Sequence, residues 1–127
     1  PASQNHSIIQ TTDVFPTLVE LAGGDPDQYK DLDGVSLLST IRENDLLDRG
    51  VPIYGYRAYE DLYTSVREGD WKLFAYRSGK TELYNVASDI FEVNDLADKY
   101  PARVKALTQK LIAWEKEMEV DQYSGVQ

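Results

Sequence analysis

The fold of this chain is decided by the segment Leu62-Tyr-Thr-Ser-Val-Arg-Glu-Gly-Asp-Trp-Lys-Leu-Phe-Ala-Tyr76. In its first half every second residue suits a buried face, namely Leu62, Thr64 and Val66, and such alternation is typical of a β-strand. Glu68-Gly69-Asp70 then supplies a tight turn, after which residues 71–76, apolar except for Lys72, read as a returning strand. The segment therefore predicts an antiparallel hairpin.

Two flanking segments extend this hairpin into a meander. Pro52-Ile-Tyr-Gly-Tyr-Arg57 reads as a preceding strand, with its proline at an edge where it removes no ladder hydrogen bond. On the other side, Arg77-Ser-Gly-Lys80 is a second turn signal and Thr81-Glu-Leu-Tyr84 a fourth strand. We expect an antiparallel sheet of about four strands between Pro52 and Asn85.

A long helix is expected to follow a polar connection over 86–99. Pro101 suits its first turn, and its apolar residues recur at alternating spacings of three and four: Val104, Leu107, Leu111, Trp114 and Met118. Such a stripe needs an apolar surface to pack on, most simply one face of the sheet. The predicted fold class is therefore α+β, an antiparallel sheet packed against a long C-terminal helix and preceded by a short helix.

That short helix is predicted over Asp13-Val-Phe-Pro-Thr-Leu-Val-Glu-Leu-Ala-Gly23. Asp13 is expected to act as its N-cap, accepting hydrogen bonds from the free N–H groups of the first turn. Pro16 falls within that turn, and Gly23 and Gly24 supply the left-handed residue that ends a helix. An apolar face is formed at helical spacing by Val14, Leu18, Leu21 and Ala22.

The chain is expected to divide into three parts. Residues 1–50 hold the first helix, polar loops and a short helical turn near 36–41. Residues 51–119 hold the sheet and the long helix, and residues 120–127 form a tail. The absence of an initiator Met leads us to expect that the chain comes from within a longer polypeptide or follows processing.

Composition limits the classes of partner. The 127 residues carry a net charge of −9, which argues against nucleic acid and against anionic lipid, since both need clustered Lys and Arg. No apolar run approaches the roughly 20 residues of a membrane span, so no membrane partner is expected. With no cysteine, there is no disulfide and no thiolate metal site.

Residues suited to catalysis or metal binding are few. His6 is the single histidine, and Ser36 lacks the second glycine of a nucleophile elbow, so it is expected to hydrogen-bond local backbone. Carboxylates gather in two loops and could bind calcium or cap turns: Asp31, Asp33, Asp89, Glu92 and Asp95. Capping is the preferred interpretation, so the prediction is no catalytic residue and no metal site.

The nine Tyr and two Trp residues allow two interpretations. Aromatic side chains stack on sugars, but they also form strands well and fill sheet faces, and we favour core packing for most of them. Arg57 is the best placed cation for an anionic ligand, with Tyr56 and Tyr59 beside it, although an ion pair with the acidic loop 60–61 is an alternative. These three residues are the candidate substrate-binding set.

Taken in order, five motifs resemble the C-terminal region of the sulfatases, members of the alkaline phosphatase superfamily. The first helix is similar to their D-x-x-P-T-L segment. The others are similar to the family's D-G-x-S-L, R-x-G-x-W-K-L, E-L-Y-[DN] and D-P-x-E-x-x-[ND]-L-A segments: Asp33–Leu37, Val66–Leu73, Glu82–Asn85 and Asp89–Ala97. Ile90 stands where the last motif usually has proline. Together they cover roughly residues 8–118.

The resemblance implies a sulfatase whose catalytic part lies N-terminal to this region. There a formylglycine, made from Cys or Ser in a C/S-x-P-x-R motif, acts with a divalent metal, usually calcium. This chain has no such motif. The resemblance therefore implies a non-catalytic C-terminal fragment without its own cofactor, which supports the N-terminal catalytic domain of the same polypeptide and lines its substrate cleft. Residues 1–50 would join that domain.

The parent would then hydrolyse sulfate esters, for example on a sulfated glycan, and the fragment alone would be inactive. If the parent is bacterial, a periplasmic or extracellular location is expected. Two alternatives stay open: a free-standing binding or interaction domain, with self-association through exposed apolar surface, and the C-terminal part of a related phosphonate or phosphodiester hydrolase.

Overall fold

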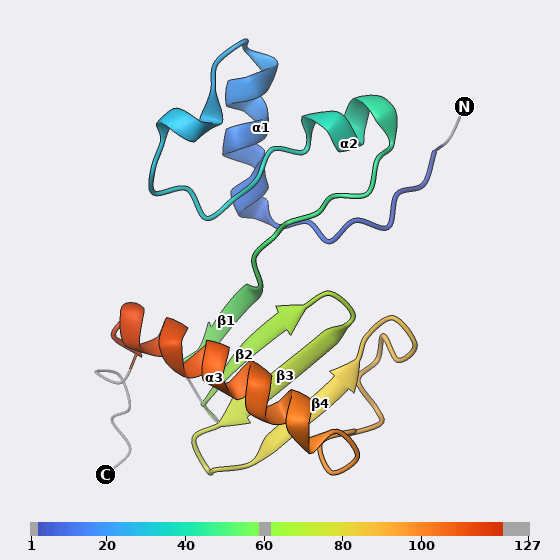
Figure 1. Ribbon diagram of the computed structural model, residues 1–127, viewed down its shortest axis with the longest axis vertical. Helices are drawn as coiled ribbons and strands as arrows, with labels where there is room; N and C mark the ends of the chain where they lie inside the picture. The colour runs from blue at the N-terminus through green and yellow to red at the C-terminus, as the bar shows by residue number, and fades with distance from the viewer. Residues whose placement is uncertain (1–2, 59–61, 121–127) are drawn as a thin grey trace. The chain divides into compact units, whose positions relative to one another are not determined.

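The computed structural model describes residues 3–58 and 62–120 and divides the chain into two compact units. Unit 1 spans Pro1–Gly50 and unit 2 spans Val51–Gln127. Each unit has its own secondary structure (Figure 1). None of the helices in the described ranges combines the length and apolar character needed to cross a membrane.

Unit 2 contains a four-stranded antiparallel sheet. Its strands are β1 (Ile53–Arg57), β2 (Tyr63–Glu68), β3 (Trp71–Tyr76) and β4 (Thr81–Asn85), and each pairs with the next in the order β1-β2-β3-β4. The turns use glycine where the backbone needs a left-handed residue, with φ of 56° at Gly69 and 89° at Gly79. The predicted meander is confirmed.

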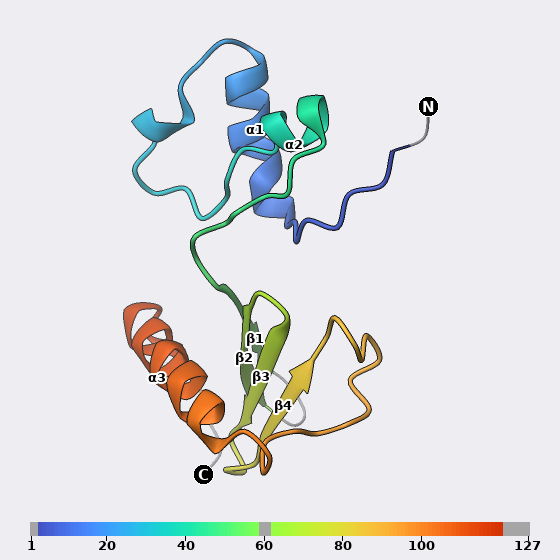
Figure 2. The same ribbon diagram turned by 45° about the vertical axis from the view of Figure 1, so that its right-hand side comes forward.

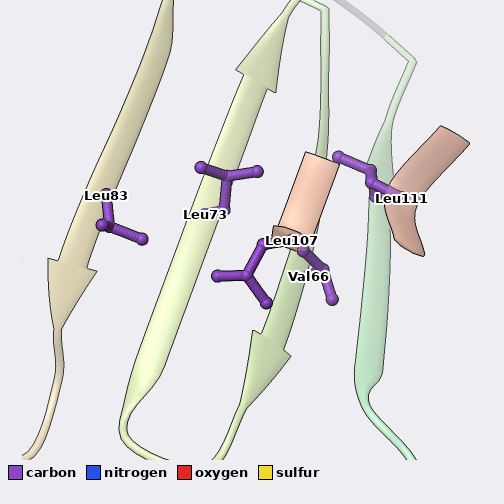
Figure 3. Close-up of a cluster of buried hydrophobic side chains, with 5 residues drawn as sticks. All are labelled: Val66, Leu73, Leu83, Leu107 and Leu111. Atoms are coloured by element: carbon purple, nitrogen blue, oxygen red, sulfur yellow. The ribbon is translucent and has the colours of Figure 1, made fainter. Parts of the chain in front are cut away.

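Helix α3 (Pro101–Glu117) crosses one face of this sheet, as Figures 1 and 2 show. Between helix and sheet lies the core of unit 2, made of five fully buried side chains: Val66, Leu73, Leu83, Leu107 and Leu111 (Figure 3). The alternation in β2 places Val66 in this core, and the helical spacing places Leu107 and Leu111 there. The predicted α+β architecture is therefore confirmed.

The apolar stripe of α3 is one residue shorter than predicted. Val104 and Trp114 pack against the core, but Met118 follows the last residue of the helix and is 57% exposed. Val120 is buried instead, at 4% exposure.

Unit 1 contains four short helical segments: η1 (Thr11–Asp13), α1 (Val14–Leu21), η2 (Pro26–Gln28) and α2 (Leu38–Glu43). Gly23 has a φ of 82° just after α1, as predicted for the residue that ends this helix. Asn44 plays the same part after α2, with a φ of 60°.

The prediction that Asp13 caps α1 with its side chain is wrong. Asp13 precedes the helix, but its carboxylate accepts no hydrogen bond from the first turn. Its own backbone is helical, with φ of −74° and ψ of −16°, because η1 leads directly into α1. The carboxylate instead faces other segments of unit 1.

Candidate functional site

The Asp13 carboxylate is the centre of a buried polar cluster in unit 1. It is fully buried and accepts hydrogen bonds from the backbone N–H groups of Gln10 (2.6 Å, to Oδ2) and Val35 (3.0 Å, to Oδ1). Nη1 of Arg49 completes the cluster, 2.6 Å from Oδ2. One carboxylate thus joins three separate segments of the unit.

This cluster keeps Asp13 charged. Burial raises the pKa of its carboxyl, but the Arg49 hydrogen bond and the amides of Val35 and Gln10 outweigh that effect, so the pKa lies below its usual value. With three donors bound to it and no exposure to solvent, the carboxylate is not accessible to a ligand. The arrangement indicates a structural role.

A second set of contacts joins the start of α1 to the segment Asp33–Leu37. The Thr17 hydroxyl donates to the carbonyl of Asp13 (2.6 Å) and accepts from the N–H of Leu37 (2.9 Å). Gly34 lies so close to the carbonyl of Thr12 that a Cβ atom at this position would collide with it. The D-x-x-P-T-L and D-G-x-S-L segments therefore hold each other in place.

Ser36 also forms hydrogen bonds within unit 1. Its hydroxyl donates to the carboxylate of Glu20 and accepts from the N–H of Leu38 (3.2 Å) at the start of α2. The predicted local backbone contact of Ser36 is confirmed. The single histidine, His6, is exposed in the extended segment before η1.

In unit 2, the loop after β4 is fixed by its carboxylates. Oδ1 of Asp95 accepts from the N–H groups of Leu83 (3.0 Å) and Ala97 (2.9 Å), and the N–H of Leu96 donates to the carbonyl of Leu83 (2.7 Å). These bonds satisfy backbone groups on the outer edge of β4, which would otherwise be open to pairing.

Asp89 and Glu92 shape the tip of this loop. Oδ2 of Asp89 accepts from the N–H groups of Val93 (3.0 Å) and Asn94 (2.8 Å), and these bonds lower the pKa of its carboxyl. Glu92 has a φ of 55° and pairs with Lys72 of β3 at 2.7 Å. The Asp89 carboxylate therefore caps a bend, as the sequence predicted, whereas the Glu92 carboxylate bonds the Lys72 side chain instead of a backbone group. Within residues 3–58 and 62–120, no three His, Cys, Asp or Glu side chains gather as a metal site would require.

The aromatic residues mostly pack on one another. On the α3 face, Tyr54 stacks on Trp114 with 5.1 Å between ring centroids, and Trp71 meets Tyr100 edge-on at 5.1 Å. A second cluster, on the opposite face of the sheet, contains Tyr63, Phe74, Tyr76 and Tyr84. Core packing, the interpretation favoured from the sequence, accounts for these rings.

Glu82 organises the polar rim of this second cluster. Its carboxylate accepts from the phenol of Tyr76 (2.8 Å) and pairs with Lys80. Burial, together with the hydrogen bond and charge of Glu82, raises the pKa of Tyr84 to about 12. The Tyr84 phenol is therefore a neutral hydrogen-bond donor at physiological pH.

The structure does not bring the candidate substrate-binding residues together on one face. Tyr56 lies opposite Thr64, whose hydroxyl bonds Glu115 of α3, so Tyr56 is on the helix side of β1. Arg57, the next residue, is on the other side, where its guanidinium lies 5.9 Å from the ring centroid of Tyr63. Tyr59 and the acidic loop 60–61 lie outside the described residues. The assignment of these residues stays a prediction.

Sequence reasoning placed an apolar face on α1, and the structure leaves much of it open to solvent. Four side chains are half or more exposed: Val14 (54%), Phe15 (50%), Leu18 (56%) and Leu21 (58%). Within unit 1 the helix buries Pro16 and Thr17 instead. We call these four side chains the α1 apolar surface.

Sequence comparison finds sulfatases over most of the chain. Arylsulfatase J of Mus musculus is 26% identical and arylsulfatase K of Bos taurus 28% identical, covering 86% and 85% of this chain. A sulfatase of Formosa agariphila is 27% identical over 84% of it. No family model matches the chain. The chain spans about a quarter of the length of these relatives, at 26%, 22% and 23%.

Fold comparison finds solved structures that share the fold of this chain over most of its length. The crystal structure of Ps i-CgsB matches 85% of this chain with a TM-score of 0.72 at 23% identity. A structure titled BT4656 in complex with D-glucosamine-2-N,6-O-disulfate matches 91% with a TM-score of 0.66 at 21% identity. The chain covers 24% and 25% of these two structures. Over most of its length, then, this chain is similar in sequence to sulfatases, and the match fits the C-terminal sulfatase region that its five motifs predict.

Proposed function

We propose that this chain is the C-terminal part of a sulfatase polypeptide, where it supports the catalytic part and forms one wall of the substrate cleft. In this proposal residues 1–50 join the catalytic domain, residues 51–119 form the C-terminal subdomain, and residues 120–127 are a tail. The parent would hydrolyse sulfate esters with a formylglycine and a calcium ion that its N-terminal part supplies.

The observation that carries the proposal is the α1 apolar surface. Phe15 and Leu18 are large apolar residues on a helix whose termini and buried face are already fixed by contacts within unit 1. Exposed apolar side chains grouped on one helix mark an interaction site. The relatives are about four times longer than this chain, so the occupant that fits best is the remaining part of the same polypeptide.

The substrate class follows from the neighbours and is the finer part of the proposal. Two structural neighbours were crystallised with saccharides, one with a neocarrahexaose and one with a disulfated glucosamine called its substrate. We therefore propose a sulfated saccharide as the substrate of the parent. Arg57 would face its anionic groups from one side of β1 and Tyr56 would act from the helix side, while Tyr59 is proposed from the sequence alone.

A turnover assay tests the catalytic assignment. The purified chain should not hydrolyse 4-nitrophenyl sulfate above the buffer blank, because the motifs it contains serve packing and backbone capping. Turnover that persists through purification and gel filtration with the chain would contradict the proposal. Reading the encoding gene upstream of Pro1 gives an independent test, since a C/S-x-P-x-R motif some hundreds of codons earlier is expected.

A related activity has one observation in its favour. Phosphonate monoester hydrolase of Agrobacterium radiobacter matches 83% of the chain with a TM-score of 0.55 at 21% identity. Comparing sulfate and phosphonate monoesters as substrates of the longer polypeptide separates the two. Preference for the sulfate ester is expected, because the compared sequences are sulfatases.

The role of the α1 apolar surface is tested in the chain itself. A Leu18→Asp/Leu21→Asp variant should fold normally, because both side chains are more than half exposed, and should bind less of an apolar dye. It should also fail to associate with a separately produced N-terminal part that captures the wild-type chain. If the variant abolishes self-association of the isolated chain but leaves that capture intact, the surface belongs to an interaction between copies instead.

A further inference from the structure

A cavity of about 530 Å³ lies at the start of α3, and neither Tyr56 nor Arg57 lines it. Its walls include Glu68 at the end of β2 and Lys99, Tyr100 and Arg103 around the first turn of the helix, with Leu107 among the apolar lining. Tyr100 is 37% exposed, whereas Leu107 belongs to the buried core. The volume falls within the range of small-ligand pockets, roughly 300–1,000 Å³.

The two cations of this cavity are held against aromatic rings. The guanidinium carbon of Arg103 lies 4.6 Å from the ring centroid of Trp71, and Nζ of Lys99 lies 5.4 Å from that of Tyr100. Trp71 and Tyr100 also contact each other, with 5.1 Å between centroids. Cation–π contacts of this kind orient a charge without neutralising it.

The charges around the cavity favour an anion. The carboxylate of Glu68 is already paired with Lys110. In the part of the chain that the structure describes, Lys99 and Arg103 form no ion pair with any carboxylate. Two uncompensated cations thus share one cavity of a protein whose net charge is −9.

We propose that this cavity binds a sulfated saccharide. The sulfate group would lie against Arg103 and Lys99, since guanidinium and ammonium groups donate strong charge-assisted hydrogen bonds to oxyanions. The sugar ring would lie along Tyr100 and the apolar lining beside Leu107, as sugars stack on aromatic faces. The choice of sulfate over another anion rests on the proposed function. The presence of the cavity and of its two cations is independent of that function.

Calorimetric titration of the purified chain tests the site. The probes are N-acetylglucosamine 6-sulfate and galactose 4-sulfate, each compared with its unsulfated parent sugar and with inorganic sulfate at low salt. We expect at least one sulfated sugar to bind about tenfold more tightly than both its parent sugar and inorganic sulfate. Raising the salt concentration should weaken that binding.

Matched variants locate the binding. Arg103→Gln and Lys99→Gln should each weaken binding about five- to tenfold, whereas Lys105→Gln should leave it unchanged, because Lys105 is an exposed cation of the same helix that does not line the cavity. Circular dichroism melts of all three variants show whether they fold as the parent chain does.

Four results would overturn the proposal: no binding of either sulfated sugar, equal binding of the unsulfated sugars, equal binding of inorganic sulfate, or binding that survives both cavity substitutions. None of them bears on sulfate ester turnover by the longer polypeptide. Failure here is therefore distinct from failure of the sulfatase assignment.

Discussion

Asp13 and Arg49 form a buried ion pair across 36 positions of sequence, with 2.6 Å between carboxylate and guanidinium and side-chain exposures of 0% and 8%. The carboxylate also holds the amides of Gln10 and Val35. This pair fixes the start of α1 against the end of unit 1.

Replacing Asp13 with Ala should unfold unit 1. The substitution leaves the Arg49 charge buried without its partner, which costs about 3–5 kcal/mol, as much as a unit of this size can supply. In the NMR spectrum, the amide resonances of unit 1, among them that of Val35, should move to random-coil chemical shifts, while those of the β-sheet keep their positions. Asp33→Asn is the matched control, because Asp33 is exposed in the neighbouring motif; an equal effect there would contradict the assignment.

Unit 1 should also lose stability in acid. Because the pKa of Asp13 is lowered in the folded state, its contribution is complete above the pKa of the unfolded chain, about 3.9. It is lost as the pH falls from there through the lowered folded value. Hydrogen exchange at Val35 between pH 5 and pH 2.5 measures this loss. Exchange protection that stays constant over this range would count against the ion pair.

Substitutions along α3 should separate core from surface. Leu107→Ala removes a side chain that is 1% exposed and should lower the free energy of unfolding of unit 2 by about 2–5 kcal/mol. Ile112→Ala, where the side chain is 58% exposed, should cost about 0.5 kcal/mol or less. Urea unfolding followed by Trp fluorescence measures both. Similar costs would mean that α3 packs by another face.

The Tyr84 phenol should be among the last to ionise. Its pKa is raised to about 12, so its contribution to stability is complete below the unfolded value, about 10. That contribution is lost as the pH rises from there towards 12. Absorbance at 295 nm should show a late tyrosinate step that Tyr84→Phe removes, while Tyr29→Phe leaves it in place. Persistence of the step in Tyr84→Phe would assign it to another phenol.

The sequence predicted the elements well because their signals are local. The alternation of Leu62, Thr64 and Val66 and the glycines at positions 69 and 79 set the strands of unit 2 to within a residue or two. Helix α3 was found from the spacing of its apolar residues. Met118 was misplaced because the helix ends at Glu117 and no glycine marks that end; the left-handed residue that follows is Glu119, with a φ of 53°.

The contacts between distant segments could not be predicted. Asp13 has the residue type and position of an N-cap, and only the fold brings Arg49 and Val35 to its carboxylate. Arg49 stands in a charged stretch with no pattern that marks it as buried. For the candidate site, strand geometry alone would have separated Tyr56 from Arg57, since neighbouring residues of a strand face opposite sides. The cavity beside Tyr100 depends on packing between α3 and β2 and left no linear signal.

The close approach of Gly34 to the carbonyl of Thr12 has a consequence for how such chains are recognised. A side chain at this position would force two motifs apart, so the glycine reports a fit between backbones and not a reaction. The same holds for Asp13, Thr17 and Asp95, whose polar atoms are engaged by backbone and side-chain groups of the chain. A descendant that had lost its nucleophile could keep all these residues. In this region, matching motifs indicate common descent and shared packing. Catalytic activity can be inferred only from the catalytic residues themselves.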